Sequence, residues 1–198
     1  MQQIDKVASV FDEGYYHNDR LDYSWGRLQK EFRASANVIK QRFDPVSLLD
    51  VGCAKGFMVK ALHEINVDAW GVDASKYALA AAPPEVQFFL SRGIIQALPF
   101  NDMAFDTVLC CDVLEHIPEE DAELACSELM RVTDRRLIIN VITLEVPDYD
   151  DPTHITIKPR QWWVDKLLSH GGQEVPYDSY GAAVWWFNVR ERSIVIQK

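Results

Sequence analysis

The chain has 198 residues, with 20 Lys and Arg against 30 Asp and Glu, so its formal net charge at pH 7 is −10. This length suffices for one well-buried domain and is too short for two typical domains with a linker. The acidic balance disfavours nucleic acid as a substrate, because a negative surface repels the phosphate backbone and no run of Lys and Arg offsets it. Residues 1–5 lack a basic segment followed by an apolar one, and no apolar run reaches membrane-spanning length. We therefore expect a single cytoplasmic domain without a membrane span.

Residues 1–46 combine an aromatic cluster with a predicted helix. The cluster contains five aromatic residues mixed with acids: Phe11, Tyr15, Tyr16, Tyr23 and Trp25. Over residues 25–43 apolar residues recur at helical spacing and predict a helix packed on a sheet. Tyrosines separated by acids and by Gly14 make a poor core, so we interpret the segment before the helix as a lid over a bound cofactor. An ordered arm without that role is the alternative.

A glycine-containing turn follows the apolar run 48–51. Gly52, Ala54 and Gly56 alternate with other residues and lead into a second apolar-periodic segment, which predicts strand, tight turn and helix. Glycine accepts positive φ and lets a ligand approach the backbone, while the first N–H groups of the helix favour an anionic group such as a carboxylate. The spacing G-x-A-x-G differs from the dinucleotide pattern G-x-G-x-x-G, which disfavours a nicotinamide-dependent oxidoreductase.

An acid stands at the end of the next apolar run, 69–73. Asp73 comes about 20 residues beyond the turn, where a carboxylate can accept hydrogen bonds from both hydroxyls of a ribose. The turn and this acid together predict a site for a nucleoside-containing cofactor.

From Ser47 onward, apolar runs alternate with helical patterns, which is typical of parallel βαβ units. We expect strands near 47–51, 68–73, 86–90, 105–111 and 136–143, and helices near 56–65, 75–81 and 118–131. A further helix should follow Pro159 and end at Gly171 and Gly172, before closing strands near 173–180 and 192–197. The predicted fold class is α/β.

Four motifs in order carry a resemblance to a known family. They are LLDVGCAKGF at 48–57, GVDAS at 71–75, ALPF at 97–100 leading into FDTV at 105–108, and CDVLEHIP at 111–118. In this order they resemble the motifs of the class I S-adenosylmethionine-dependent methyltransferases, in particular the small-molecule branch of methyltransferase type 11/12. The match runs from about Leu48 to the C-terminus.

This resemblance implies a fold and an activity. The fold is a single Rossmann-like, doubly wound, seven-stranded and mostly parallel sheet with helices on both faces. Residues 47–198 would form the methyltransferase domain, and residues 1–46 its lid. The activity is transfer of a methyl group from S-adenosylmethionine, with S-adenosylhomocysteine as product, to an oxygen or nitrogen of a small-molecule acceptor. A catalytically inactive protein that binds S-adenosylmethionine in a regulatory or partner role is the alternative.

The resemblance also assigns cofactor-binding residues. Gly52, Ala54 and Gly56 would lie against the amino-acid end of the cofactor, and Asp50 would either orient this turn or face the cofactor's ammonium group. The other positions are Asp73 with its neighbour Ala74 at the ribose, Ile94 and Ile95 at the adenine, and Cys111, whose backbone would line the methionine part. Ile94 replaces the acid that the family usually places there, so the adenine would rely on apolar contact and on the N–H of Ile95.

Two histidines are candidates for the base that removes a proton from the acceptor. His154 is the first, because its loop resembles the substrate-side loop of small-molecule methyltransferases, and His116 is the second. A lone histidine at position 116 is more often a structural cap.

Two further clusters have competing interpretations. Asp148, Asp150 and Asp151 with His154 could hold a metal, but their spacing matches no recognisable site, and a solvated loop is the favoured interpretation. The run 185–187, Trp-Trp-Phe, is either core or the contact of a homodimer. We therefore assign no metal.

Overall fold

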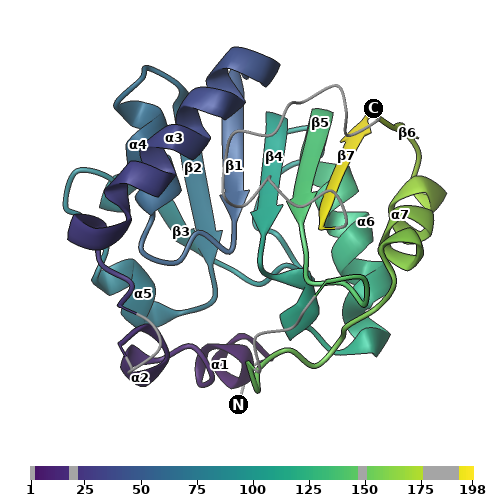
Figure 1. Ribbon diagram of the computed structural model, residues 1–198, viewed down its shortest axis with the longest axis horizontal. Coiled ribbons are helices and arrows are strands. Elements are labelled where there is room, and N and C mark those ends of the chain that lie inside the picture. The colour runs from purple at the N-terminus through teal and green to yellow at the C-terminus, as the bar shows by residue number, and fades with distance from the viewer. Residues whose placement is uncertain (1–2, 18–21, 147–150, 176–191) are drawn as a thin grey trace. The chain divides into compact units, whose positions relative to one another are not determined.

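The computed structural model describes residues 3–17, 22–146, 151–175 and 192–198 (Figure 1). Its contacts divide the chain into two compact units, Met1–Ile94 and Ile95–Lys198, each described here by itself. The predicted division into a lid (1–46) and a methyltransferase domain (47–198) follows another boundary and stays a prediction.

The first unit contains three parallel strands in the order β3-β2-β1. They are β1 (Ser47–Val51), β2 (Asp68–Asp73) and β3 (Leu90–Arg92). Leu48 and Leu49 are neighbours in β1 whose side chains point to opposite faces, and both are fully buried. A strand with two buried faces gives the continuous apolar run seen in the sequence.

Helices of the first unit precede and connect these strands: α1 (Gln3–Ala8), α2 (Glu13–Tyr16), α3 (Trp25–Phe43), α4 (Phe57–His63), α5 (Lys76–Ala80) and the 3-10 helix η1 (Gln87–Phe89). α3 packs on α4, and α4 packs on β2 (Figure 1). α3 has the predicted bounds and buries Phe32, Ala36 and Ile39 on one face. It ends at Asp44, whose left-handed backbone (φ 40°) stops the helix.

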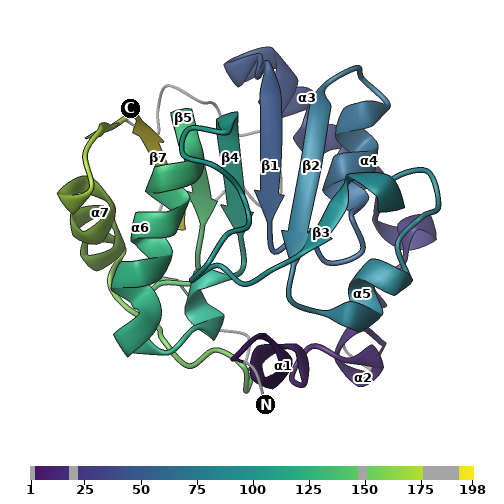
Figure 2. The same cartoon turned by 180° about the vertical axis from the view of Figure 1, so that it is seen from behind.

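The second unit contains four strands in the order β4-β5-β7-β6. They are β4 (Phe105–Cys111), β5 (Thr133–Asn140), β6 (Gln173–Glu174) and β7 (Ser193–Gln197). β4 and β5 are parallel, whereas β7 runs antiparallel to both of its neighbours. The helices are α6 (Ala122–Val132), α7 (Arg160–Ser169) and the 3-10 helices η2 (Leu114–His116) and η3 (Glu119–Asp121). α6 packs on β4 and β5 (Figure 2), and α7 packs beside β6 and β7 (Figure 1).

The predicted α/β class with mostly parallel strands is confirmed, and two of its strands are displaced. The third was expected near 86–90, but Phe89 N donates to Val86 O at 2.9 Å in a helical turn, and β3 begins only at Leu90. The fifth was expected near 136–143, but it starts directly after α6 and ends at Asn140. The N–H of Ile142 is bound instead to Oε1 of Glu115 at 2.9 Å, which takes it out of the sheet. Of the closing strand expected near 173–180, only residues 173–175 lie within the described ranges.

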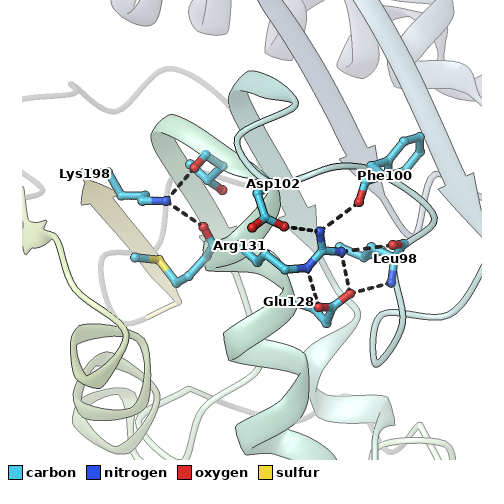
Figure 3. Close-up of polar contacts among 8 residues, drawn as sticks. Leu98, Phe100, Asp102, Glu128, Arg131 and Lys198 are labelled. Carbon is cyan, nitrogen blue, oxygen red and sulfur yellow. Dashed lines mark hydrogen bonds and ion pairs between the residues drawn. The ribbon is translucent and has the colours of Figure 1, made fainter.

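Arg131, near the C-terminal end of α6, anchors the segment 98–103 of the second unit (Figure 3). Its guanidinium donates to the carbonyls of Leu98 at 3.1 Å and Phe100 at 2.8 Å, and pairs with Glu128 and Asp102. Glu128 also accepts from the N–H of Leu98 at 2.8 Å. The segment that follows Ile95 is therefore held to α6 by side chains that satisfy its backbone groups.

No helix within the described ranges is long and apolar enough to cross a membrane.

Candidate functional site

The turn after β1 has an unusual backbone. Gly52, Ala54 and Gly56 all adopt positive φ, at 78°, 48° and 68°. This conformation is easy for glycine, but Ala54 pays a steric cost of about 1–2 kcal/mol for its Cβ. The turn is closed by hydrogen bonds from the amides of Gly52 and Cys53 to Val72 O, at 2.8 and 3.1 Å. The alternating pattern in the sequence therefore corresponds to alternating left-handed residues.

Asp73, at the end of β2, holds this turn in place. Its Oδ2 accepts from the amide of Ala54 at 2.8 Å, and its Oδ1 accepts from the amide of Ser75 at 2.7 Å. Burial raises the pKa of Asp73, although these two hydrogen bonds oppose the shift. The backbone of Ala74 also interacts with this carboxylate. A carboxylate has about four acceptor positions, so Asp73 keeps capacity for a further hydrogen bond.

Asp50 is a second buried acid in the same unit. It lies in β1 and is only 6% exposed. Burial, together with the negative charge of Asp73, raises the pKa of Asp50 to about 7. Two carboxyl groups that disfavour each other's charge make a site where a cationic group would be stabilised.

Lys55 connects the turn to the N-terminal arm. Its Nζ donates to the carbonyl of Tyr23 at 3.0 Å and lies 2.8 Å from Nε2 of His17. The amine also lies 5.5 Å from the ring centroids of Tyr16 and Tyr77, within the range of a cation–π contact. Loss of hydration lowers the pKa of Lys55, whereas the negative charges of Asp22 and Glu13 act in the opposite direction and raise it.

Two further contacts fix the arm to the same corner. Ser75 Oγ donates to the carbonyl of Phe11 at 2.5 Å, and Arg92 pairs with Asp5 at 2.7 Å. The aromatic cluster packs around Tyr16, which is 4% exposed and stacks on Tyr77 with ring centroids 6.0 Å apart. The described residues of the arm thus contact α5 and the glycine turn within the first unit.

The predicted adenine-side residues follow β3. Gly93 N donates to Asp73 O at 3.0 Å, and Arg92 Nε donates to Ala74 O at 3.3 Å, which ties this segment to the end of β2. Ile94, the last residue of the first unit, is half-buried. Ile95 opens the second unit and is 6% exposed.

In the second unit, β4 ends at Cys111, which is half-buried, and the chain turns at Asp112 with φ 51°. Asp112 N donates to Asn140 O at 2.9 Å, and its carboxylate forms an ion pair with Arg192. A non-glycine residue in this conformation is uncommon, and here the ion pair and the backbone bond hold it.

Glu115, in η2, is fully buried. Its Oε1 accepts from Ile142 N, and its carbonyl accepts from the amides of Ile155 and Thr156 at 2.9 and 3.0 Å. Burial and the charge of Asp112 raise the pKa of Glu115 to about 8. Glu115 therefore fastens the segment that carries His154 to the end of β4.

The two candidate histidines lie side by side. The ring centroids of His116 and His154 are 4.8 Å apart. His116 Nδ1 lies 2.9 Å from Thr153 Oγ1 and 3.2 Å from Thr153 O. Thr153 Oγ1 in turn donates to Asp151 Oδ1 at 2.6 Å. The structure thus brings together two residues that lie far apart in the sequence.

Within the part of the chain that the structure describes, no three His, Cys, Asp or Glu side chains form a cluster that could hold an ion. Asp148 and Asp150 lie outside that part, and so does the run 185–187 considered as a dimer contact.

Sequence reasoning missed Lys55 and Thr153. Lys55 occupies a variable position inside the turn pattern, between Ala54 and Gly56, and its only signal is its positive charge. Thr153 lies in the loop that resembles a substrate-side loop, but nothing in the sequence indicates its contact with His116, which crosses 37 positions.

Comparison with known proteins adds three findings. Residues 49–136 match the family model described as a methyltransferase domain. The magnesium-protoporphyrin O-methyltransferase of Synechocystis is 33% identical over 143 residues, which are 69% of this chain and 62% of that protein. The ubiquinone biosynthesis O-methyltransferase of Paracidovorax citrulli is 28% identical over 56% of this chain and 54% of that protein. The chain therefore spans a little more than half the length of these relatives.

Solved structures show the same fold. The magnesium protoporphyrin IX methyltransferase of Synechocystis, solved with bound S-adenosylmethionine, gives a TM-score of 0.63 at 17% identity and covers 100% of this chain and 96% of that one. A methyltransferase solved in complex with the Trm112 activator of Haloferax volcanii gives 0.68 at 12% identity, covering 100% and 97%. The predicted doubly wound, Rossmann-like architecture is confirmed.

Proposed function

Because the chain carries a methyltransferase domain of the class I S-adenosylmethionine-dependent type, we propose that the protein transfers a methyl group from this cofactor to an oxygen of a small-molecule acceptor. The observation that carries the proposal is the pair of buried acids, Asp50 and Asp73, around a turn with three left-handed residues. Oxygen is favoured over nitrogen because both relatives described above are named O-methyltransferases.

The donor set of the first unit fits the cofactor. The remaining acceptor capacity of Asp73, beside Ala74, suits a ribose hydroxyl, while its existing bonds keep the carboxylate oriented. Asp50 suits the cofactor's ammonium group, because a cation would relieve the repulsion between the two acids. Gly52, Ala54 and Gly56 would leave room for the amino-acid end along the backbone.

The remaining cofactor residues are assigned by their motif positions. Ile94 and Ile95 would contact the adenine, and the backbone of Cys111 would line the methionine part. Arg131 supports this role indirectly, because it holds the segment that follows Ile95.

When bound, S-adenosylmethionine supplies a methyl group on a sulfonium, which is already a good leaving group. The protein's own task is to align the acceptor and to take up its proton. His154 and His116 are the two candidate bases, and their rings lie close enough to serve the same acceptor. The arm that Lys55 fastens over the glycine turn would exclude water.

Isothermal titration of S-adenosylmethionine tests the cofactor assignment. Asp73→Ala should weaken binding by roughly 1.5–3 kcal/mol, because a charged acceptor for hydroxyl groups is lost. Asp68→Ala is the matched control, since Asp68 is an exposed acid at the other end of the same strand. Thermal unfolding of each variant separates loss of fold from loss of affinity.

Three results would change the proposal. Unchanged affinity in a folded Asp73→Ala protein would remove Asp73 from the site. Absence of binding by the unmodified protein would refute the cofactor itself. Tight binding without turnover of any phenol, carboxylic acid or amine acceptor would favour the inactive regulatory or partner protein.

A further inference from the structure

Two contacts at Nδ1 of His116 indicate which of its ring nitrogens carries the proton. Nδ1 lies 3.2 Å from the carbonyl oxygen of Thr153, which can only accept. A hydrogen bond at this contact therefore requires a proton on Nδ1. In a neutral imidazole the lone pair is then on Nε2.

The side chain of Thr153 leads independently to the same tautomer. Its hydroxyl has one proton, and Asp151 Oδ1 accepts it at 2.6 Å. Desolvation would raise the pKa of Asp151, but the hydrogen bonds from Thr153, together with the neighbouring His154 and His116, lower it, so Asp151 is ionised. An ionised carboxylate is a stronger acceptor than a neutral imidazole nitrogen. The hydroxyl can thus contact His116, at 2.9 Å, only by accepting from Nδ1–H.

The backbone keeps this arrangement in place. Asp151 Oδ1 also accepts from the amide of Thr153 at 2.8 Å, and Asp151 O accepts from the amide of His154 at 3.0 Å. Immediately beyond, Glu115 O accepts from Ile155 N at 2.9 Å. The turn formed by residues 151–154 is therefore held at a fixed distance from η2.

We propose that Thr153 is a positioning residue that holds His116 as the Nδ1–H tautomer, with Asp151 as its support, so that Nε2 is the basic nitrogen of the candidate site. This inference rests on the proposed methyl transfer and makes His116, rather than His154, the oriented base.

In the proposed reaction, each bond that forms is matched by a bond that breaks. The acceptor oxygen forms its bond to the methyl carbon, the carbon–sulfur bond breaks, and its electron pair stays on sulfur. The proton of the acceptor hydroxyl passes to Nε2 of His116. The resulting imidazolium keeps Nδ1–H directed at Thr153, whose hydroxyl remains bound to the carboxylate of Asp151.

Nitrogen-15 NMR of protein with labelled histidine reads the tautomer directly and needs neither cofactor nor acceptor. The chain has five histidines, so a His116→Gln variant assigns the signal. At a pH where His116 is neutral, the unmodified protein should show Nδ1–H. Thr153→Val keeps the turn and the carbonyl but loses the hydroxyl, and the ratio of Nδ1–H to Nε2–H should fall about three- to tenfold.

Two controls make the result specific. Thr153→Ser retains the hydroxyl and should restore the ratio. Thr156→Val removes a hydroxyl from the same segment, one that donates to Ile117 O at 2.6 Å, and should leave the ratio unchanged. Asp151→Asn should shift the ratio in the same direction as Thr153→Val, because a neutral amide competes less well for the hydroxyl proton.

The proposal is overturned if His116 in the unmodified protein is the Nε2–H tautomer, or if Thr153→Val leaves the ratio as it was. Failure to bind S-adenosylmethionine would refute the proposed function instead, and the NMR result would still decide how Thr153 acts on His116.

Discussion

Replacing Asp50 with asparagine should remove the pH dependence of stability that this buried acid contributes. Folding buries Asp50 beside Asp73 and raises its pKa from the ordinary value of 3.8 to about 7. The folded state then binds more protons than the unfolded state between these two values. For such a group the free energy of unfolding is highest below pH 4, falls as the pH rises to 7, and changes little beyond.

The magnitude follows from these two pKa values. Between pH 5 and pH 8 this single group should lower the free energy of unfolding by about 2–3 kcal/mol. An amide at this position cannot ionise, so the free energy of unfolding of the Asp50→Asn variant should not fall in this way. Measured relative to the unmodified protein, the stability of the variant should therefore rise by that amount between pH 5 and pH 8. Any cost of the amide itself is the same at both pH values and cancels in the comparison.

Urea denaturation at pH 5 and pH 8 measures this difference. Asp68→Asn, which makes the same substitution at an exposed acid, is the control and should show no such change with pH. An equal effect of Asp50→Asn at both pH values would mean that Asp50 is ionised throughout, and our view of the two buried acids as mutually repelling would be wrong.

Two further substitutions test the arm and the base. Lys55→Met keeps a long apolar side chain but removes the amine that binds Tyr23 O. Amide hydrogen exchange at Tyr15 and Tyr16 should therefore become about tenfold faster. The control Lys76→Met, on the exposed side of α5, should not produce an equal acceleration. With Nε2 of His116 as the base, His116→Ala should lower turnover roughly 10²- to 10⁴-fold with little change in cofactor affinity, and His154→Ala should lower it less. Full activity in that variant, insensitive to chelator, would leave His116 as the base and exclude a metal in its loop.

Local patterns predicted the part of the fold that surrounds the turn. β1, β2 and α3 have the predicted bounds, because each depends on a buried apolar run or stripe that is continuous in sequence. Gly52 and Gly56 were recognisable for the same reason, since a left-handed backbone selects a residue type at the position itself.

Contacts between distant segments explain what the sequence did not predict. β5 ends early because Glu115, 27 positions away, takes the amide of Ile142. The tautomer of His116 depends on Thr153 and Asp151, which follow a different strand. No periodicity or composition within either segment records which partner it will meet, so these features required the structure.

At Ala54 a local backbone conformation is combined with a contact to a distant segment. An alanine in a left-handed conformation costs about 1–2 kcal/mol. The structure supplies the compensation, because the amide of this same residue binds the buried carboxylate of Asp73 at 2.8 Å. A charge-assisted hydrogen bond contributes about as much as the strain costs. Asp73 thus stabilises the turn before any ligand arrives, and the acid that would bind the ribose is already oriented by the backbone that would bind the amino-acid end.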